Sequence, residues 1–259
     1  MKHNGKRLSR LELPQVTLCA VSSVNLKATV AALKKCLFEA NFSSALLFTD
    51  AEISDLPEEI RLVKIPKLNS SREYSEFILL RLCDFISSEY CLVVQWDGHI
   101  IDATKWCPDF FNFDYIGASW PQFSDGFDVG NGGFSLRSRR MMELCRHNDF
   151  QICHPEDIAI GRANRKWLEA NNVRFAPRAV ADRFSTERSG DLANSFGYHG
   201  VWLMPQVLGI EEFWSLYSDL DERGTIRHDF AGIVRQAWKG PGGWRRAFRL
   251  ALDQTRLKA

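Results

Sequence analysis

The sequence predicts an α/β fold: one Rossmann-like domain with a mixed, mostly parallel sheet, followed by C-terminal helices. The main observation is that short apolar runs, typical of buried strands, alternate with segments of helical spacing through the first half of the chain. The second is composition: 259 residues, 45% hydrophobic and 25% charged, are ordinary globular proportions and provide ample material for a core. Beyond residue 210 only helical patterns remain.

Four strands and two helices are expected in the first half. Each strand is a short apolar run, and each helix places its apolar residues three or four positions apart. The expected strands cover residues 16–21, 45–49, 62–65 and 90–95, and the expected helices cover residues 24–40 and 73–87. This strand–helix–strand–strand–helix–strand order predicts an open sheet with mostly parallel strands and covered faces.

The second half is expected to be less regular. Short strands are predicted at residues 114–118 and 134–137, with a loop rich in Gly, Asp and Phe between them. A helix follows from about Ser138. Another is predicted over residues 155–170, where a proline stands early and two acids occupy the first turn.

The charge balance gives no electrostatic basis for nucleic acid as a partner. Lys and Arg number 33 against 32 Asp and Glu, a formal net charge of +1. The charge is uneven, however, because residues 235–259 carry a net +6 and residues 1–234 a net −5. An acidic main body therefore carries a basic tail.

The cysteines predict a reducing, cytoplasmic compartment. All seven are dispersed and no pair has C-x-x-C spacing, which argues against a zinc ribbon or a thioredoxin-like site. The N-terminal segment contains basic residues without an apolar core, so no secretory signal is expected. No apolar run approaches the roughly 18 residues that a membrane span requires.

Two segments next to predicted strands have the composition of a binding site. Asp97 follows the fourth strand, at the carboxyl end where open α/β sheets bind ligands, although an ordinary Asp-Gly turn is the simpler explanation. Asn131, Gly132 and Gly133 precede a later strand, where glycines let the backbone approach a ligand closely. Their spacing matches neither a dinucleotide fingerprint nor a P-loop, and the alternative is a tight loop.

Two further segments contain titratable side chains. Glu156 and Asp157 begin a predicted helix, where acids commonly interact with the helix dipole; the functional alternative is a general base above a cleft. His199 stands in a glycine-flanked segment. Together with an aspartate from a distant strand, it would suit a divalent ion with open coordination positions.

Taken in order, these segments resemble the glycosyltransferase-A fold, in which a D-x-D-type motif holds a divalent metal ion on a nucleotide-sugar diphosphate. The resemblance places Asp97 at the last position of that motif, with Gln95 in place of the first acid. It matches Glu156 and Asp157 to an E-D motif, and His199 to the late histidine that completes the metal site. Over about residues 14–207 the chain looks specifically similar to an uncharacterised bacterial glycosyltransferase-like family, through the runs 95–98, 132–135, 155–157 and 196–200.

The resemblance implies an inverting enzyme that moves a sugar from a nucleotide-sugar donor to a hydroxyl acceptor. It implies Asp157 as the catalytic base, with Glu156 orienting the substrate. Mn²⁺ or Mg²⁺ is expected at Asp97 and His199. The donor, of the UDP type, is expected to contact Ser22, Ser23, Asp50, Gln95, Asp97, Asn131, Gly132 and Gly133. The expected acceptor is a saccharide or a lipid-linked molecule.

Two other classes compete with this interpretation. A non-catalytic nucleotide-sugar- or carbohydrate-binding domain of the same fold is favoured by Gln95, whereas the retention of Asp157 and His199 argues against it. A Rossmann-like oxidoreductase or methyltransferase requires a glycine-rich turn after the first strand, and residues 20–25 contain no glycine. Three tryptophans are candidates for stacking on a sugar, with packing in the core as the alternative: Trp96, Trp120 and Trp202.

The C-terminal region, residues 208–259, is expected to form a helical extension to a main domain at residues 14–207. Within it, residues 244–258 have the pattern of a basic amphipathic helix. Such a helix either rests peripherally on the inner face of a membrane or packs its Trp and Phe on the main domain with its arginines solvated. Its apolar stripe consists of Trp244, Phe248, Ala251, Leu252 and Thr255, and mainly off that stripe lie Arg245, Arg246, Arg249, Arg256 and Lys258.

Overall fold

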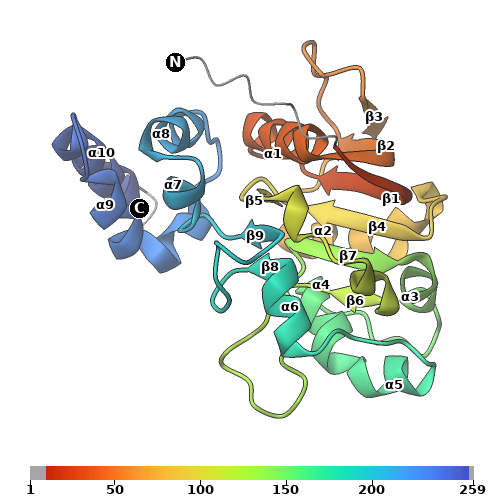
Figure 1. The fold of residues 1–259 in the computed structure, drawn as a ribbon. Coiled ribbons are helices and arrows are strands. Elements are labelled where there is room, and N and C mark those ends of the chain that lie inside the picture. The colour runs from red at the N-terminus through yellow and green to blue at the C-terminus, as the bar shows by residue number, and fades with distance from the viewer. Residues whose placement is uncertain (1–9, 257–259) are drawn as a thin grey trace.

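The computed structural model describes residues 10–256 and has a six-stranded sheet at its centre (Figure 1). The strands are β1 (Leu11–Val21), β2 (Ala40–Thr49), β3 (Ile60–Lys64), β4 (Tyr90–Val94), β6 (Tyr115–Ile116) and β7 (Phe134–Ser138). They lie in the order β3-β2-β1-β4-β7-β6. The strands β1 to β4 are mutually parallel, β7 is antiparallel to β4, and β6 is antiparallel to β7. The predicted α/β class with a mixed, mostly parallel sheet is therefore confirmed.

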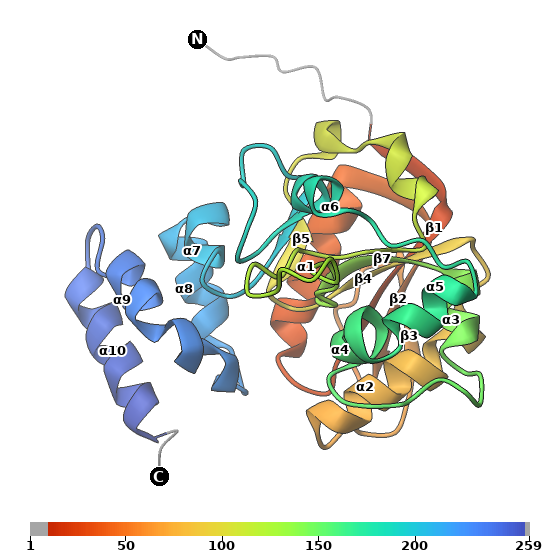
Figure 2. The ribbon, with the colours of Figure 1, turned by 90° about the horizontal axis from the view of Figure 1, so that it is seen from below.

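Helices cover both faces of this sheet (Figure 2). Along β1, Leu18 and Ala20 pack on one face and Cys19 and Val21 on the other, as the two-residue period of a strand requires. One face is covered by α1 (Leu26–Glu39) and α6 (Arg178–Phe184). The opposite face is covered by α2 (Ser71–Leu80), α3 (Arg139–Leu144) and α5 (Arg165–Ala170). Residues at the strand ends are thus positioned by a sheet that is packed on both sides.

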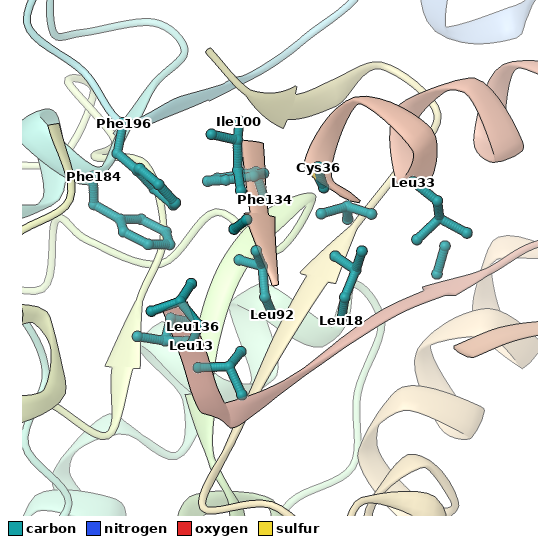
Figure 3. Packing of buried hydrophobic residues seen from close by; sticks show 14 of the residues in the cluster. Leu13, Leu18, Leu33, Cys36, Leu92, Ile100, Phe134, Leu136, Phe184 and Phe196 are labelled. Atoms are coloured by element: carbon teal, nitrogen blue, oxygen red, sulfur yellow. The ribbon is translucent and has the colours of Figure 1, made fainter. Parts of the chain in front are cut away.

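Aromatic packing on the α1 side fixes the segment that leads to His199 (Figure 3). The rings of Phe134 and Phe184 have centroids 5.3 Å apart, and those of Phe184 and Phe196 are 5.8 Å apart. All three rings are fully buried. A Cβ on Gly197 would stand 2.3 Å from the Phe134 ring, so only glycine permits this close approach.

A second, three-stranded sheet is not expected from the sequence. It consists of β5 (Gly98–Ile100), β8 (Ser185–Thr186) and β9 (Gly197–His199), in the order β5-β9-β8. Strands of two or three residues are too short to show a hydrophobic period, which is why the sequence pattern misses them. The central strand β9 is antiparallel to β5 and parallel to β8.

Two of the predicted helices are wrong as single elements. Residues 73–87 form α2 and a 3₁₀ turn, η1 (Leu82–Phe85), and residues 155–170 form α4 (Glu156–Ile158), a π-helical turn (Ala159–Ala163) and α5. In the second case the reason is the buried Asn164, whose amide nitrogen donates to the carbonyl oxygens of Gln151 and Ala159 at 2.8 and 2.9 Å. These hydrogen bonds compete with the regular helical ladder. Glu156 and Asp157 therefore lie on one short turn.

The chain beyond β9 is helical, as predicted. Its elements are α7 (Met204–Val207), α8 (Ile210–Ser218), the 3₁₀ turn η5 (Gly224–Asp229), α9 (Phe230–Ala237) and α10 (Gly243–Arg256). They gather to one side of the main sheet, around Phe213, Tyr217 and Ile233 (Figures 1 and 2). Two further 3₁₀ turns, η2 (Ala103–Lys105) and η3 (Pro108–Asn112), follow β5.

Asn25 connects the C-terminal helices to the end of β1. Its side-chain oxygen accepts hydrogen bonds from the backbone N–H groups of Asp221 and Glu222 at 3.1 and 2.9 Å. The division of the chain at residue 207 stays a prediction. Residues 1–9 and 257–259, including Lys258, lie outside the described residues. Between residues 10 and 256, no helix has the length and apolar character needed to cross a membrane.

Candidate active site

Three cavities meet at Gln95, the residue that follows β4. We call them the large, middle and small cavities, with volumes of about 460, 430 and 190 Å³. The large cavity extends over the ends of β1 and α2, the middle cavity over Asp97 and toward η5, and the small cavity toward α4. This is the carboxyl end of parallel strands, where an open α/β sheet binds its ligands.

The large cavity brings together Gln95 and two other predicted donor-binding residues. Ser22 and Ser23 line it, and Ser23 Oγ accepts a hydrogen bond from the Leu68 N–H at 2.9 Å. Asp50 lies outside the lining of this cavity. The Ser23 hydroxyl beside it is the main cause that lowers the pKa of the Asp50 carboxyl. Asp50 therefore interacts with Ser23, which lines the large cavity, and is not itself part of the cavity wall.

The register of the small sheet brings two acids to His199. Because Gly98 is opposite His199 in the β5–β9 pair, Asp97 lies next to the histidine, with Oδ1 3.3 Å from Nε2. Because β8 runs beside β9 and ends at Thr186, the following Glu187 reaches the other ring nitrogen, with Oε1 3.5 Å from Nδ1. A buried histidine, 13% exposed, is therefore held between two buried carboxylates.

Several polar atoms of this group have no hydrogen-bond partner among the described residues. The distances are those of ion pairs, yet Asp97 Oδ1, Glu187 Oε2 and His199 Nδ1 are buried without hydrogen-bond geometry to any neighbour. Burial lowers the pKa of His199, but the carboxylates, Asp97 first, outweigh burial and hold this pKa well above its usual 6.5. A buried polar atom without a partner costs about 1–3 kcal/mol, which favours a ligand that satisfies it.

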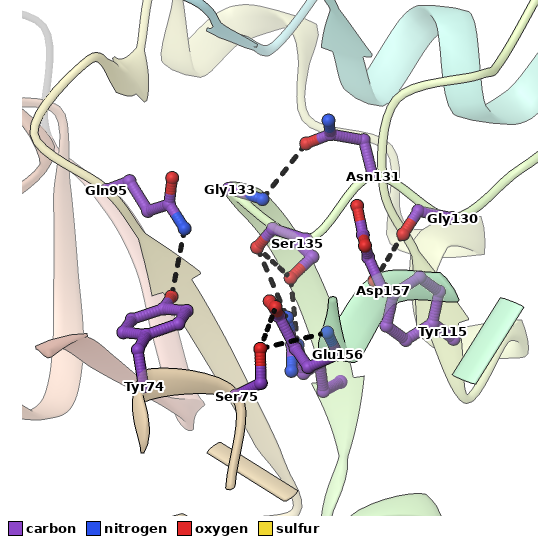
Figure 4. Close-up of polar contacts among 12 residues, drawn as sticks. Tyr74, Ser75, Gln95, Tyr115, Gly130, Asn131, Gly133, Ser135, Glu156 and Asp157 are labelled. Carbon is purple, nitrogen blue, oxygen red and sulfur yellow. Dashed lines mark hydrogen bonds and ion pairs between the residues drawn. The ribbon is translucent and has the colours of Figure 1, made fainter. Parts of the chain in front are cut away.

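The geometry fits a divalent cation held by two protein ligands, Asp97 and His199, provided that the cation displaces the proton of His199 Nε2. In an octahedral site with bonds of about 2.1 Å, neighbouring ligand atoms lie about 3 Å apart, close to the 3.3 Å between Asp97 Oδ1 and His199 Nε2. Gln95 donates from its amide nitrogen to the Tyr74 hydroxyl at 3.0 Å (Figure 4), which leaves its amide oxygen 3.3 Å from His199 Nε2. In residues 10–256, no group of three or more His, Cys, Asp or Glu side chains is arranged to hold a metal ion alone. Phosphate and water would have to complete the coordination, as is common for Mg²⁺.

Glu156 belongs to a closed network at the small cavity (Figure 4). Its Oε1 accepts from Arg137 Nη2 at 3.3 Å, and its Oε2 accepts from the Ser75 hydroxyl at 3.4 Å. Arg137 is 1% exposed and also donates to Ser135 Oγ at 2.9 Å and to the Gly132 carbonyl at 3.2 Å. The Glu156 carboxylate is therefore turned toward protein groups.

Asp157 has a pKa that suits a general base at neutral pH. Burial is the main cause that raises this pKa, the charge of Glu156 adds to the shift, and the pKa reaches about 7. The Asp157 Oδ1 accepts a hydrogen bond from the Ile158 N–H at 2.7 Å. Asp157 lines the small cavity together with His199. A carboxyl that can exchange a proton near pH 7 thus faces the same space as His199.

Gly132 and Gly133 closely approach two side chains of the site, Glu156 and His199 respectively. A Cβ on Gly133 would stand 2.0 Å from His199 Nε2, and a Cβ on Gly132 would stand 2.4 Å from Glu156 Oε1. Asn131 Oδ1 accepts from the Gly133 N–H at 2.9 Å (Figure 4). Glycine is required here because His199 and Glu156 both approach the loop. The predicted sugar contacts of this loop stay a prediction.

A family model matches the part of the chain that builds this site. The matched residues are 59–199, and the family is described as a protein of unknown function, DUF5672. The chain belongs to this family. The match ends at His199 and includes Gln95, Asp97, the glycines of the loop and the Glu156–Asp157 pair, whereas Ser22, Ser23 and Asp50 precede it.

Two solved structures are similar to this DUF5672 member in overall shape. One is the mannosyltransferase PcManGT from Pyrobaculum calidifontis in complex with GDP-Man and Mn²⁺, with 9% identity, a TM-score of 0.46, and coverage of 96% of this chain and 76% of that one. The other is a glycosyltransferase involved in the glycosylation of the major capsid of PBCV-1, with 11% identity, a TM-score of 0.45, and coverage of 79% and 100%. No curated protein matches the chain in sequence.

Of the three tryptophans considered as sugar-stacking surfaces, Trp120 is a core residue. It is 6% exposed, and its ring would stand 2.5 Å from a Cβ on Gly130. Trp96 lines the large and middle cavities, and Trp202 lines the middle cavity. The guanidinium carbon of Arg188 lies 3.5 Å from the centroid of the Trp202 ring. Only Trp96 and Trp202 of the three are cavity walls.

Three residues of the DUF5672 site are missed by sequence reasoning: Ser75, Arg137 and Glu187. Arg137 carries a signal, because a charged residue inside a buried strand needs a buried partner. Glu187 carries none, since its position depends on the pairing of β8 with β9. Ser75 likewise meets Glu156 only because α2 packs on α4.

Proposed function

We propose that this chain is a glycosyltransferase that moves a sugar from a nucleotide-sugar donor to a hydroxyl acceptor. The observation that carries the proposal is the small cavity, which is lined by Asp157, with a pKa of about 7, and by His199 beside Asp97. Glycosyl transfer needs a base at the acceptor and charge stabilisation at the leaving diphosphate. The residues of this cavity can provide both.

The donor is proposed to lie across the meeting point of the cavities. Its nucleoside, of the uridine type, would occupy the large cavity beside Ser22 and Ser23, and its diphosphate would lie next to Gln95. Asp97 and Glu187 alone would repel a diphosphate. Mn²⁺ or Mg²⁺ held by Asp97 and His199 would stabilise the leaving diphosphate as a Lewis acid.

Asp157 is proposed to remove the proton of the acceptor hydroxyl as its oxygen attacks the anomeric carbon. The bond from the sugar to the diphosphate breaks while the new bond forms on the opposite face, so the configuration inverts and the proton ends on Asp157. Because the Glu156 carboxylate contacts Arg137 and Ser75, we assign it a positioning role. Its charge helps to raise the pKa of Asp157.

The acceptor, a saccharide or a lipid-linked molecule, is proposed to enter through the middle cavity. Trp202 provides an aromatic wall there, and Arg188 is fixed above it by two hydrogen bonds to Asp229, at 2.6 and 2.8 Å. An aromatic surface with fixed polar groups is a common composition for a saccharide site. We place the reaction in the cytoplasm, since all seven cysteines are free thiols.

A second candidate function is a nucleotide-sugar- or carbohydrate-binding domain without catalysis. The observation that favours it is Gln95, whose neutral amide oxygen, 3.3 Å from His199 Nε2, stands where a carboxylate would bind a cation more strongly. In that case the donor would bind, and Asp157 would have no role in a reaction.

Donor hydrolysis separates the two candidates. The full chain is incubated with a panel of UDP- and GDP-sugars in Mn²⁺ or Mg²⁺, and released sugar is measured with and without a chelator. We expect release from at least one donor, lost on chelation and in Asp157→Asn. Calorimetric binding of a donor with no release in any arm, even with added saccharide acceptors, would favour the binding domain.

A further inference from the structure

Helix α10 exposes an apolar stripe, and its buried side includes two charged residues. The stripe formed by Trp244, Phe248, Ala251, Leu252 and Thr255 is exposed along its whole length. Trp244 and Phe248 are 61% and 62% exposed. Of the two alternatives for this helix, the one in which these two rings pack on the main domain is therefore wrong. The buried side of the helix consists of Arg246, Ala247, Leu250 and Asp253.

Directional contacts hold α10 in this orientation. Arg246 donates to the carbonyl oxygens of Ala237 and Lys239 at 2.9 and 2.7 Å and contacts Glu211 at 3.1 Å. Two turns further on, Asp253 Oδ2 accepts from the Tyr217 hydroxyl at 2.8 Å. Rotating the helix to bury its aromatic rings would break these buried contacts, which is costly. The contacts of Arg246 and Asp253 therefore keep the rings of Trp244 and Phe248 directed outward.

We use the name aromatic ridge for four exposed apolar residues on α10 and at the adjoining end of α9: Trp238, Trp244, Phe248 and Leu252. Trp238 ends α9 and is 62% exposed, and Leu252 is 40% exposed. Since residues four apart share one side of a helix, the three members on α10 lie in a row. The helix itself is at the outer edge of the molecule in both views (Figures 1 and 2).

Basic side chains flank the aromatic ridge. Lys239, Arg245 and Arg249 are exposed, and the Arg245 guanidinium lies 5.2 Å from the centroid of the Trp244 ring. Residues 235–259 carry a net +6, whereas the rest of the chain carries a net −5. Lys239 and Arg245 are therefore exposed basic side chains next in sequence to the two exposed tryptophans, Trp238 and Trp244.

We propose that the aromatic ridge binds the surface of an anionic membrane, with its rings among the lipid headgroups and Lys239 and Arg245 on the phosphates. Tryptophan with flanking basic residues is the side-chain pattern that favours this interface. A second copy of this chain fits less well, because face-to-face ridges would bring like charges together, whereas an anionic leaflet complements them. The inference stands independently of glycosyl transfer, and its test requires no activity.

Vesicle co-sedimentation of the full chain tests the proposal. Vesicles of phosphatidylcholine alone are compared with vesicles that also contain phosphatidylglycerol. Three variants are used: Trp244→Ser with Phe248→Ser, Lys239→Gln with Arg245→Gln, and Ile152→Ser as a control that removes a 50% exposed apolar side chain elsewhere. Thermal melting confirms that each variant folds, and sedimentation velocity without vesicles gives the oligomeric state.

We expect binding to the anionic vesicles that weakens with salt and is unchanged in Ile152→Ser. The aromatic variant should lose at least tenfold in affinity, and the charge variant about fivefold for each charge removed. Equal sedimentation with and without vesicles, or binding that both variants retain, would overturn the proposal. So would a dimer that only the aromatic variant abolishes without any vesicle binding, since the ridge would then be a self-association surface.

Discussion

The two sides of the small cavity are built differently. On the α4 side, the Glu156 carboxylate is matched by Arg137 and Ser75 within the protein. On the β9 side, His199 and its two carboxylates leave buried atoms without hydrogen-bond partners among the described residues. We call the α4 side closed, because its carboxylate has protein partners, and the β9 side open, because buried polar atoms there lack them. Both sides face the small cavity of 190 Å³.

This difference assigns each side a separate task. A closed network can fix the charge and position of a neighbouring base without help from a ligand, as Glu156 does for Asp157. On the open side, the negative charge of Asp97 and Glu187 repels a diphosphate unless a cation is bound there. Variants on the α4 side should therefore affect turnover, and variants on the β9 side should affect cation-dependent donor binding.

The largest effect is expected for Asp157→Asn. Loss of a general base should reduce turnover about 10²–10⁴-fold while donor affinity is retained, because the base acts on the acceptor. Turnover and calorimetric donor binding are measured together. Asp55→Asn, at an exposed aspartate on the loop before β3, is the matched control and should behave as wild type.

Stability distinguishes this role from helix capping. The folded-state pKa of Asp157 is about 7, above its ordinary 3.8, so folding favours the protonated form. As pH rises from 3.8 through 7 the unfolded chain ionises first, and the wild type loses stability that the asparagine variant keeps. Asp157→Asn should thus melt at a higher temperature than wild type at pH 8. A variant that melts lower with normal turnover would mean that Asp157 only caps α4.

The next effect is expected for Asp97→Asn on the open side. Removing the charge of one of the two carboxylates beside His199 should weaken Mn²⁺-dependent binding of uridine diphosphate about 10–100-fold, with the fold intact. Calorimetry with and without Mn²⁺ measures it. Unchanged affinity would remove Asp97 from the cation site and, with it, the distinction between the two sides.

Adjacent glycines allow each side to be disturbed separately. Gly133→Ala should displace the His199 ring and reduce cation-dependent binding about tenfold, whereas Gly132→Ala should disturb Glu156 and leave that binding closer to wild type. Gly232→Ala is the control, since a Cβ there meets nothing within 4 Å. Equal loss of binding in both loop variants would show that the sides are not independent.

Much of the fold could be predicted from the sequence because its core strands are long enough to show their pattern. The apolar runs at 45–49 and 90–95 needed no tertiary information. The predicted helix over 155–170 failed because buried Asn164 bonds the backbone, a long-range effect that periodicity does not contain. At α10 the pattern predicts the stripe but leaves its direction open, because that direction depends on the interior partners of Arg246 and Asp253.

The candidate site was predictable where it follows strand ends or glycines, and not where it depends on pairing between distant short strands. Asp97 and His199 were predicted, and the structure places them 3.3 Å apart. Glu187 was not, because a two-residue strand leaves no trace in the hydrophobic pattern.

A moderate effect of pH on kcat/KM is expected. Since the base must be deprotonated and the pKa of Asp157 is about 7, kcat/KM should rise about tenfold per pH unit below that value and level off above it. The profile is measured at saturating Mn²⁺, with donor binding followed in parallel. A flat profile between pH 5 and 8, with binding unchanged, would contradict a base on the closed side.

The smallest effect is expected for Ser75→Ala. The Ser75 hydroxyl accepts from the Glu156 N–H at 3.2 Å and contacts Glu156 Oε2 at 3.4 Å, but Arg137 still holds the carboxylate when the hydroxyl is removed. We expect a loss of about 1 kcal/mol in the free energy of unfolding and only a few-fold fall in turnover. Ser218→Ala is the control, because that exposed hydroxyl donates one hydrogen bond, to the Trp214 carbonyl at 2.8 Å, on a helix that lines none of the three cavities. If Ser75→Ala instead lost turnover more than tenfold at unchanged stability, Ser75 would contact substrate, and the α4 side would not be closed.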